Sequence, residues 1–279
     1  YAANIGGLAT LIGSPPNTQM ASILSENFHI EVSFLDWLKI GLPLAIVMLL
    51  GMYLVFYFFL GTERKDVHDL HFHITPWTTT QKRVLFIFSV VAGLWIFRSL
   101  IGQYLGIYYR DENAAILGAL GMFLLPKESQ SKAKILNWSD TEKLPWGILF
   151  LFGGGLALAA ILEQNQILTL LSKAFISLGQ IDFMVAIIVV TTIAIFTTEV
   201  ISNLAMVTLL VPVLGAFAAQ AGLPILPLAM ALTLGASMAF MMPVATPPNA
   251  IVFGSGFIQI RHMLRFGLIL NLLGLVLIC

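Results

Sequence analysis

Long apolar stretches with almost no charge constrain this chain more than any motif in it. Residues 38–60 and 84–105 are examples, and each matches the roughly 20 residues that a helix needs to cross a bilayer. Only 10% of the 279 residues are charged and 58% are apolar, whereas a soluble domain usually carries about 25% charged residues. The apolar surplus has to face lipid. We therefore predict an all-α polytopic integral membrane protein, in a plasma membrane or a bacterial inner membrane.

The amount and placement of charge exclude several classes of function. Lys plus Arg and Asp plus Glu both total 14, so the net charge is zero and no basic face suited to nucleic acid is indicated. A channel would need a continuous polar lining, but polar residues interrupt the apolar regions only at three short places. A membrane enzyme would need a nucleophile with a base, or a metal cluster, and the apolar regions offer neither. We expect no catalytic residue and no organic cofactor.

Several apolar segments are too short to cross a bilayer alone, and these short segments come in adjacent pairs. The pairs are 1–12 with 17–28, 183–200 with 203–219, and 227–243 with 249–258. Such pairs are typical of broken helices and of re-entrant hairpins, which enter and leave the membrane on the same side. The remaining apolar segments cover residues 38–60, 84–105, 113–126, 146–163 and 264–279.

Positive charge predicts which loops lie in the cytoplasm, because short cytoplasmic loops are enriched in Lys and Arg. The loops at 61–83 and 127–145 each carry four such residues and are placed inside. Residues 29–36 and 219–226 carry none and are placed outside. Successive apolar segments then cross the membrane in alternating directions, provided that 183–219 is a hairpin that enters the membrane from outside and returns to the outside.

A short motif occurs twice, as GSPPN at 13–17 and as ATPPN at 245–249. We call these the first break and the second break, because tandem prolines lack N–H groups and clash with the preceding turn, so a helix cannot continue through them. Unwound backbone at membrane depth is tolerated where it lines a buried or wet cavity, so two matching breaks predict one shared site near the midplane. The charges of the flanking loops indicate that the breaks cross the membrane in opposite directions, as in an inverted repeat.

A third polar interruption, TTEVISNLA at 197–205, separates the two apolar arms of the hairpin, and we call it the hairpin tip. Ser202 and Asn203 are suited to cap the returning arm. A helix N-terminus presents free N–H groups and partial positive charge, so it binds an anion without Lys or Arg, and neither residue occurs in the tip or the breaks. The three interruptions together predict an anion site whose free carbonyl and hydroxyl oxygens also suit sodium.

The sequence around these interruptions resembles a known family. Four blocks are similar to the divalent anion/sodium symporter family, the carriers of dicarboxylates, citrate and sulfate: YAANIGGLATLIGSPPN at 1–17, LPWGILFLFGGGLALA at 144–159, TEVISNLAMVTLLVPV at 198–213 and ASMAFMMPVATPPNAIVFGSG at 236–256. The resemblance covers nearly the whole chain. It implies an elevator-type carrier, usually a homodimer, in which a scaffold domain holds a mobile transport domain built from two inverted repeats.

The segments and the resemblance together imply a domain order. Residues 1–60 would end the first repeat, with the broken helix at 13–17 and then a spanning helix, and 61–83 would be a cytoplasmic linker. Residues 84–279 would form the second repeat, with scaffold helices at 84–178, the re-entrant hairpin at 183–219, a broken helix at 227–258 and a last helix at 264–279. The resemblance implies two Ser-Asn hairpin tips, and no second Ser-Asn pair occurs in these 279 residues, so the first hairpin is expected upstream of Tyr1, and the chain alone should not transport.

Matched residue by residue, the resemblance implies a substrate site and a sodium site. Substrate contacts are expected from Ser202, Asn203 and Leu204 of the tip, from Thr246 and Pro247 of the second break, and from Ser14 and Pro15 of the first. Sodium contacts, mostly through main-chain carbonyls, are expected from Thr198, Ile201, Asn203 and Ala245, and from Gly13 for a second ion. Leu204 stands where many members of the family present a hydroxyl, so the preferred substrate stays open.

The expected function is sodium-coupled transport of C4-dicarboxylates such as succinate, malate and fumarate. A sodium-independent dicarboxylate exchanger is the alternative, as is a sodium-coupled sulfate or citrate carrier of the same family. Glu199 in the tip is an ionisable group in an apolar region, and the sequence leaves open whether it acts on the ligands or only pairs structurally. His68, His71 and His73 lie among charged residues and indicate a solvated linker rather than a metal site.

Overall fold

The structure is a computed structural model that describes residues 1–60, 76–128, 133–143 and 182–279, with single positions between 146 and 164. Every regular element in these ranges is a helix, and one isolated β-bridge joins Pro126 to Lys134. An all-α fold is therefore confirmed for this part of the chain. Most of the predicted linker, with its three histidines, and most of the predicted apolar segment at 146–163 lie outside the described residues.

The chain divides into two compact units. Unit 1 comprises Tyr1–Val32, Asp36–Thr62 and Gly147–Cys279, and unit 2 comprises Ser33–Leu35 and Glu63–Trp146. Both breaks and the hairpin tip belong to unit 1. The predicted site residues therefore all lie in one compact body.

Unit 2 contains α4 (Thr79–Ile96), α5 (Arg98–Leu105), α6 (Asp111–Leu124) and a short 3₁₀ helix (Trp138–Lys143). α4 packs against α6, and the indole Nε1 of Trp95 donates to the carbonyl oxygen of Asp111 at 2.9 Å. The predicted apolar segment 84–105 is therefore two helices rather than one. Phe97 separates them with backbone angles of φ −95° and ψ 10°, between the helical and extended regions. Arg98, the first residue of α5, pairs with Asp111 at 3.3 Å.

In unit 1, α1 (Ala2–Leu8) and α2 (Pro15–Phe28) are the halves of the first broken helix, and α3 (Phe34–Leu60) follows them. The chain is unwound between Leu8 and Pro15, as the tandem prolines predict. Pro15 and Pro16 occupy the first turn of α2, because the first N–H groups of a helix have no partner within it and a residue without N–H loses nothing there. α2 thus begins two residues earlier than the predicted start at 17.

The second broken helix repeats this arrangement with α11 (Ile225–Ala236) and α12 (Pro247–Gly254), followed by α13 (Ile260–Ile278). Thr246 precedes the prolines of α12 with φ −145° and ψ 152°, and Ser14 precedes those of α2 with φ −146° and ψ 149°. Both breaks therefore enter their second half-helix through the same extended residue and the same pair of prolines.

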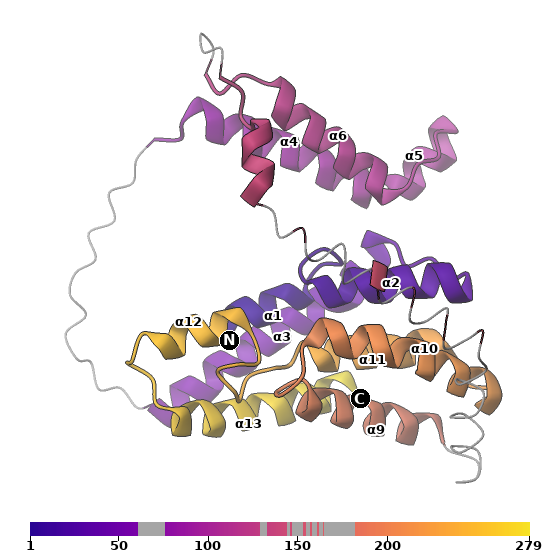
Figure 1. Ribbon diagram of the computed structural model, residues 1–279, viewed down its shortest axis with the longest axis vertical. Helices are drawn as coiled ribbons and strands as arrows, with labels where there is room; N and C mark the ends of the chain where they lie inside the picture. The colour runs from indigo at the N-terminus through magenta and orange to yellow at the C-terminus, as the bar shows by residue number, and fades with distance from the viewer. Residues whose placement is uncertain are drawn as a thin grey trace. The chain divides into compact units, whose positions relative to one another are not determined.

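The two arms of the predicted hairpin are α9 (Phe183–Thr197) and α10 (Asn203–Ala221). They run beside α11 as the orange layer of Figure 1, and α10 also packs on α2. The core between α9, α10 and α11 contains Ala186, Ile187, Phe217, Ala218, Leu228 and Ala231. Ser202 precedes the first residue of α10, at the predicted capping position, although its side chain makes no capping hydrogen bond.

Three helices of the described chain are long and apolar enough to cross a bilayer, by length and composition: Phe34–Phe59, Asn203–Ala221 and Ile260–Ile278. α3 also exposes large apolar side chains, such as Tyr57 at 60% and Phe58 at 74% exposure. An exposed apolar surface of this extent is typical of a protein whose solvent is lipid. α9 and α11 are shorter apolar helices, as expected for a hairpin arm and a half-helix.

Candidate functional site

A pocket of about 580 Å³ lies in unit 1 where the hairpin tip meets both breaks, and we call it the break pocket. Its lining includes every residue predicted to contact substrate or sodium except Thr198: Gly13, Ser14, Pro15, Ile201, Ser202, Asn203, Leu204, Ala245, Thr246 and Pro247. Thr198 is fully buried. The structure thus brings the predicted site residues together, and their contacts with a ligand stay predictions.

The buried side chain of Asn17 holds the first break. Its Nδ2 donates to the carbonyl oxygens of Gly7 and Thr10, each at 3.0 Å, and its Oδ1 accepts from the Ser14 hydroxyl at 3.0 Å. The carbonyls of Gly7 and Thr10 lie at and just beyond the end of α1, where the last C=O groups of a helix have no partner N–H within it. The amide donates to both carbonyls, of which that of Thr10 also accepts from the N–H of Gly13, and it thereby fixes the unwound segment to the first turn of α2.

Asn249 holds the second break in the same way. Its Nδ2 donates to the carbonyl oxygens of Ala239 at 2.9 Å and Met242 at 3.1 Å. In both breaks the two accepting carbonyls lie ten and seven residues before the asparagine. The signal was present in the sequence, because both copies of the motif end in Asn. Its role could not be inferred without the path of the chain.

A glycine on the following helix packs against each break. A Cβ on Gly41 of α3 would collide with the carbonyl oxygen of Leu8, and a Cβ on Gly267 of α13 would collide with that of Phe240. These carbonyls each lie nine residues before the asparagine of their break, so the two contacts fall at the same point of the two breaks. Only a residue without Cβ permits the main chains to approach this closely.

Glu199 of the hairpin tip is a buried carboxylate, 3% exposed, that is held by N–H donors. Its Oε1 accepts from the main-chain N–H groups of Phe240 and Met241, each at 2.9 Å. Its Oε2 accepts from that of Met242 at 2.8 Å, and the Asn271 side chain on α13 donates to Oε1 at 2.8 Å. No Lys, Arg or His of the described ranges pairs with it. The carboxylate therefore joins the tip to the chain just before the second break and to α13, so it has a structural role.

Thr198 joins the hairpin tip to the end of α11. Its Oγ1 lies 2.6 Å from Oδ1 of Asn203 and 2.7 Å from the carbonyl oxygen of Ala236. A hydroxyl carries one hydrogen, so it can donate to only one of these two oxygens. A cluster with more oxygen acceptors than hydrogens is the kind of environment that a hard cation prefers. The sequence did not single out Ala236, because a main-chain oxygen leaves no trace in residue type.

Asn4 of α1 lines the break pocket and reaches across to the second break. Its Nδ2 lies 3.0 Å from the carbonyl oxygen of Ala239 and 3.2 Å from Oδ1 of Asn249. The same nitrogen lies 3.0 Å from Oγ1 of Thr246. Sequence reasoning missed Asn4, because it belongs to an apolar half-helix far along the chain from the residues that it contacts.

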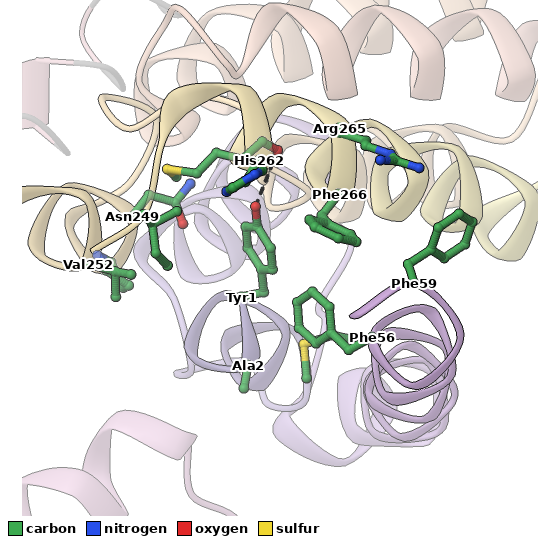
Figure 2. Close-up of a pocket in the computed structure, with 13 residues that line it drawn as sticks. Tyr1, Ala2, Phe56, Phe59, Asn249, Val252, His262, Arg265 and Phe266 are labelled. Atoms are coloured by element: carbon green, nitrogen blue, oxygen red, sulfur yellow. Dashed lines mark hydrogen bonds between the residues drawn. The ribbon is translucent and has the colours of Figure 1, made fainter. Parts of the chain in front are cut away.

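A second pocket of about 550 Å³ lies at the start of α1, among α3, α12 and α13 (Figure 2). Figure 2 shows the rings of Tyr1, Phe56, Phe59 and Phe266 around it. The Tyr1 hydroxyl donates to the carbonyl oxygen of Met263 at 3.3 Å, and Arg265 lies over the Phe59 ring, 5.5 Å from its centre. This aromatic pocket contains none of the predicted site residues, so we assign the functional site to the break pocket.

Helices that break at one shared pocket, in a unit with exposed apolar helices, are typical of the class of secondary membrane transporters. Within that class, the chain belongs to the family described as the sodium:sulfate symporter transmembrane region, whose model matches residues 1–279. The resemblance found in the sequence is thereby confirmed. The protein is an integral membrane protein of a transporter family and not an enzyme.

Curated relatives match the chain over its whole length. It is 36% identical to an uncharacterized transporter of Haemophilus influenzae and covers 59% of that protein. It is 34% identical to the sodium-dependent dicarboxylate transporter SdcS of Staphylococcus saprophyticus, of which it covers 56%. The protein of the same name from Staphylococcus aureus is 33% identical and is also covered to 56%. The chain thus spans less than two thirds of the length of these relatives.

Proposed function

We propose that the full-length protein carries C4-dicarboxylates, such as succinate, malate and fumarate, across the membrane together with sodium. The observation that carries this proposal is the meeting of three helix starts at one pocket. α2 begins at Pro15, α10 at Asn203 and α12 at Pro247, and all three residues line the break pocket. Each helix start contributes partial positive charge through its aligned peptide dipoles, which favours an anion, although the paired prolines give α2 and α12 no N–H at their first two positions.

Dipoles rather than fixed positive charges supply the attraction in this pocket. None of the described residues that line it is Lys or Arg. A carrier has to bind its substrate firmly enough to capture it and weakly enough to release it on the other side, by the same reasoning that applies to ions in pores. Helix starts and a hydroxyl of moderate strength, such as that of Thr246, meet both requirements.

The co-transported sodium would bind beside the substrate at the hairpin tip. The oxygens of Thr198, Asn203 and Ala236 already lie together, and Asn203 also lines the break pocket. The main-chain carbonyls of Ile201 and Ala245 would complete the site as the resemblance implies. A positive ion at this place would offset part of the charge of the dianion.

A second sodium would bind at Gly13 of the first break. A Cβ at this position would lie 2.6 Å from the carbonyl oxygen of Gly7, so the main chain there is packed as closely as glycine allows. Close packing of main-chain carbonyls is compatible with a ligand set made of main-chain oxygens.

We also propose that α1–α3 and α11–α13 are equivalent parts of two inverted repeats. The shared backbone angles before the prolines, the shared asparagine hydrogen bonds and the shared glycine contacts support this equivalence. Residues 1–60 would then end the first repeat and 84–279 would hold the second, with scaffold helices at 84–178 and the re-entrant hairpin at 183–219. Movement of the transport domain against the scaffold, in a homodimer, would be the elevator mechanism.

A dicarboxylate is preferred over sulfate for two reasons. The SdcS relatives are named as dicarboxylate transporters, although the family description names sulfate. Leu204, which is 8% exposed, adds apolar surface to the pocket lining. Apolar surface fits the carbon chain of a dicarboxylate and gives nothing to a small oxyanion.

Uptake of labelled succinate into proteoliposomes that hold the full-length protein tests the proposal. We expect uptake that requires an inward sodium gradient and does not require succinate inside. Uptake that requires internal succinate and ignores sodium would make the protein an exchanger. If labelled sulfate or citrate is taken up with sodium and succinate is not, the substrate is sulfate or citrate rather than a C4-dicarboxylate.

Changing Asn203 to alanine tests whether one residue serves both ligands. We expect the KM for succinate and the sodium concentration for half-maximal uptake each to rise by about tenfold, because the dianion loses a hydrogen bond and sodium loses an oxygen ligand. Asn113→Ala on α6 of unit 2 is the matched control and should leave both values as in the parent. Unchanged values for both ligands in Asn203→Ala would remove Asn203 from the proposed site.

A further inference from the structure

The two breaks differ in where the hydroxyl hydrogen of their capping residue points. In the first break the Ser14 hydroxyl donates to Oδ1 of Asn17 at 3.0 Å, so its hydrogen is used within the break. In the second break, Oγ1 of Thr246 accepts from the main-chain N–H of Asn249 at 3.4 Å and lies 3.0 Å from Nδ2 of Asn4. Both of these partners are nitrogen donors. The hydrogen of Thr246 is therefore left for the break pocket, which Thr246 lines.

The orientation of both amides follows from the atoms around them. Nδ2 of Asn249 faces two main-chain carbonyl oxygens, which can only accept, so its Oδ1 has to be the atom that faces Asn4. Nδ2 of Asn4 in turn faces this oxygen and the carbonyl of Ala239. The nitrogen of Asn4 is thus a donor, and Thr246 cannot donate to it.

We propose that Asn4 is a positioning residue whose amide nitrogen, a donor 3.0 Å from Oγ1 of Thr246 and 3.2 Å from Oδ1 of Asn249, makes the Thr246 hydroxyl an acceptor on that side and leaves its hydrogen free to donate to a carboxylate oxygen of the bound dianion. The inference rests on the proposed function, because it assigns the donor for that substrate. Asn4 belongs to α1 and Thr246 to the second break. A side chain of one broken helix therefore determines whether the hydroxyl of the other donates to the pocket. Ser14, whose hydrogen is already used, presents lone pairs instead.

The first break shows what happens at the second when Asn4 is removed. Where no side-chain amide donor faces the hydroxyl of the capping residue, its hydrogen goes to Oδ1 of the break asparagine, as it does from Ser14 to Asn17. In Asn4→Ala the Thr246 hydroxyl would turn to Asn249 in the same way. The pocket would then lose its donor although Thr246 is still present.

A double-mutant cycle in the full-length carrier tests this mechanism. Asn4→Ala and Thr246→Val are each expected to raise the KM for succinate, at saturating sodium, by about 10- to 100-fold, the range for a lost hydrogen bond to a charged group. The double variant is expected to be no worse than either single one, because both changes remove the same donated hydrogen. Effects that multiply in the double variant would overturn the proposal.

Two further readouts separate positioning from a general loss of structure. Asn4→Asp offers only acceptors, so it would draw the Thr246 hydrogen to itself, and its KM is expected to exceed that of Asn4→Ala. The sodium concentration for half-maximal uptake should stay within twofold of the parent in Asn4→Ala. A shift in the sodium value equal to the shift in KM would mean that Asn4 supports the fold and not the hydroxyl.

The cycle is run with the dianion that the parent carries, chosen from labelled succinate, malate, citrate and sulfate. Failure of succinate and malate uptake in the parent would overturn the proposed substrate, while the cycle with the carried ion still tests Asn4. Gel filtration and thermal unfolding check that each variant is folded. If Asn4→Ala is not recovered, Asn4→Ser takes its place in the cycle, with the same expected lack of additivity.

Discussion

Replacing Glu199 by alanine is expected to abolish sodium-dependent uptake by the full-length carrier and to lower its unfolding temperature. The change removes the acceptor of four N–H donors, from Phe240, Met241, Met242 and Asn271. The contacts from Phe240 and Asn271 are buried, and each buried donor left unsatisfied costs about 1–3 kcal/mol, so these two alone give roughly 2–6 kcal/mol. This is a large share of the 5–15 kcal/mol that typically separates folded from unfolded protein. Succinate uptake and thermal unfolding in detergent measure the two effects.

Glu199→Gln and Glu26→Ala make the test specific. The glutamine oxygen can still accept from Phe240 and Met241, but its NH₂ group faces the N–H of Met242, so an intermediate loss is expected. Glu26 is an exposed carboxylate on α2 of the same unit, and its removal should change neither uptake nor unfolding. If Glu199→Ala behaves like Glu26→Ala, the carboxylate does not hold the tip to the second break.

Gly267→Ala is expected to lower uptake by at least tenfold and to destabilise unit 1 by about 1–3 kcal/mol, the usual cost of overpacking. The added Cβ collides with the carbonyl oxygen of Phe240, and the main chain there cannot yield without straining the hydrogen bond from Phe240 to Glu199. Gly41→Ala should act in the same way on Leu8 in the first break. Substrate uptake and the unfolding temperature are again the measurements.

Gly93→Ala is the control for these glycine changes. Gly93 lies inside α4, and a Cβ there would meet nothing within 4 Å. Alanine is favoured over glycine in a helix interior by about 1 kcal/mol, so this variant should be as stable as the parent or more stable. Equal losses in Gly93→Ala and Gly267→Ala would show that close approach to Phe240 is not the cause.

The sequence predicted those features whose cause is local. A helix cannot continue into tandem prolines from the preceding turn, so both breaks were visible. Ser202 with Asn203 marked the start of α10 through their preference for helix caps. The resemblance then named residues that the structure gathers at the break pocket. Phe97 gave no comparable signal, because no proline lies in the segment that becomes α4 and α5, and its two glycines, Gly93 and Gly102, both lie inside the helices.

The roles that escaped prediction depend on partners that residue types do not reveal. Glu199 binds main-chain N–H groups of Phe240, Met241 and Met242, and as a sequence these three read only as apolar. Asn4 acts on residues more than two hundred positions away in the chain. Gly41 and Gly267 matter because their lack of a Cβ lets the carbonyl groups of Leu8 and Phe240 approach α3 and α13 closely. All of these roles follow from the path of the backbone, which spacing in the sequence does not fix.

The asparagine that holds each break also determines whether the chain loses the conformational entropy of its unwound segment during folding or only when a ligand binds. Fixing the backbone of one residue costs about 1–2 kcal/mol, so ordering the six residues between Leu8 and Pro15 on binding would cost roughly 6–12 kcal/mol. A micromolar ligand supplies only about 8 kcal/mol in total. Because Asn17 orders this segment during folding, an arriving dianion meets a preorganised loop and spends no affinity on arranging it. Loose binding is then compatible with selective recognition, and the loop need not unfold each time the dianion leaves.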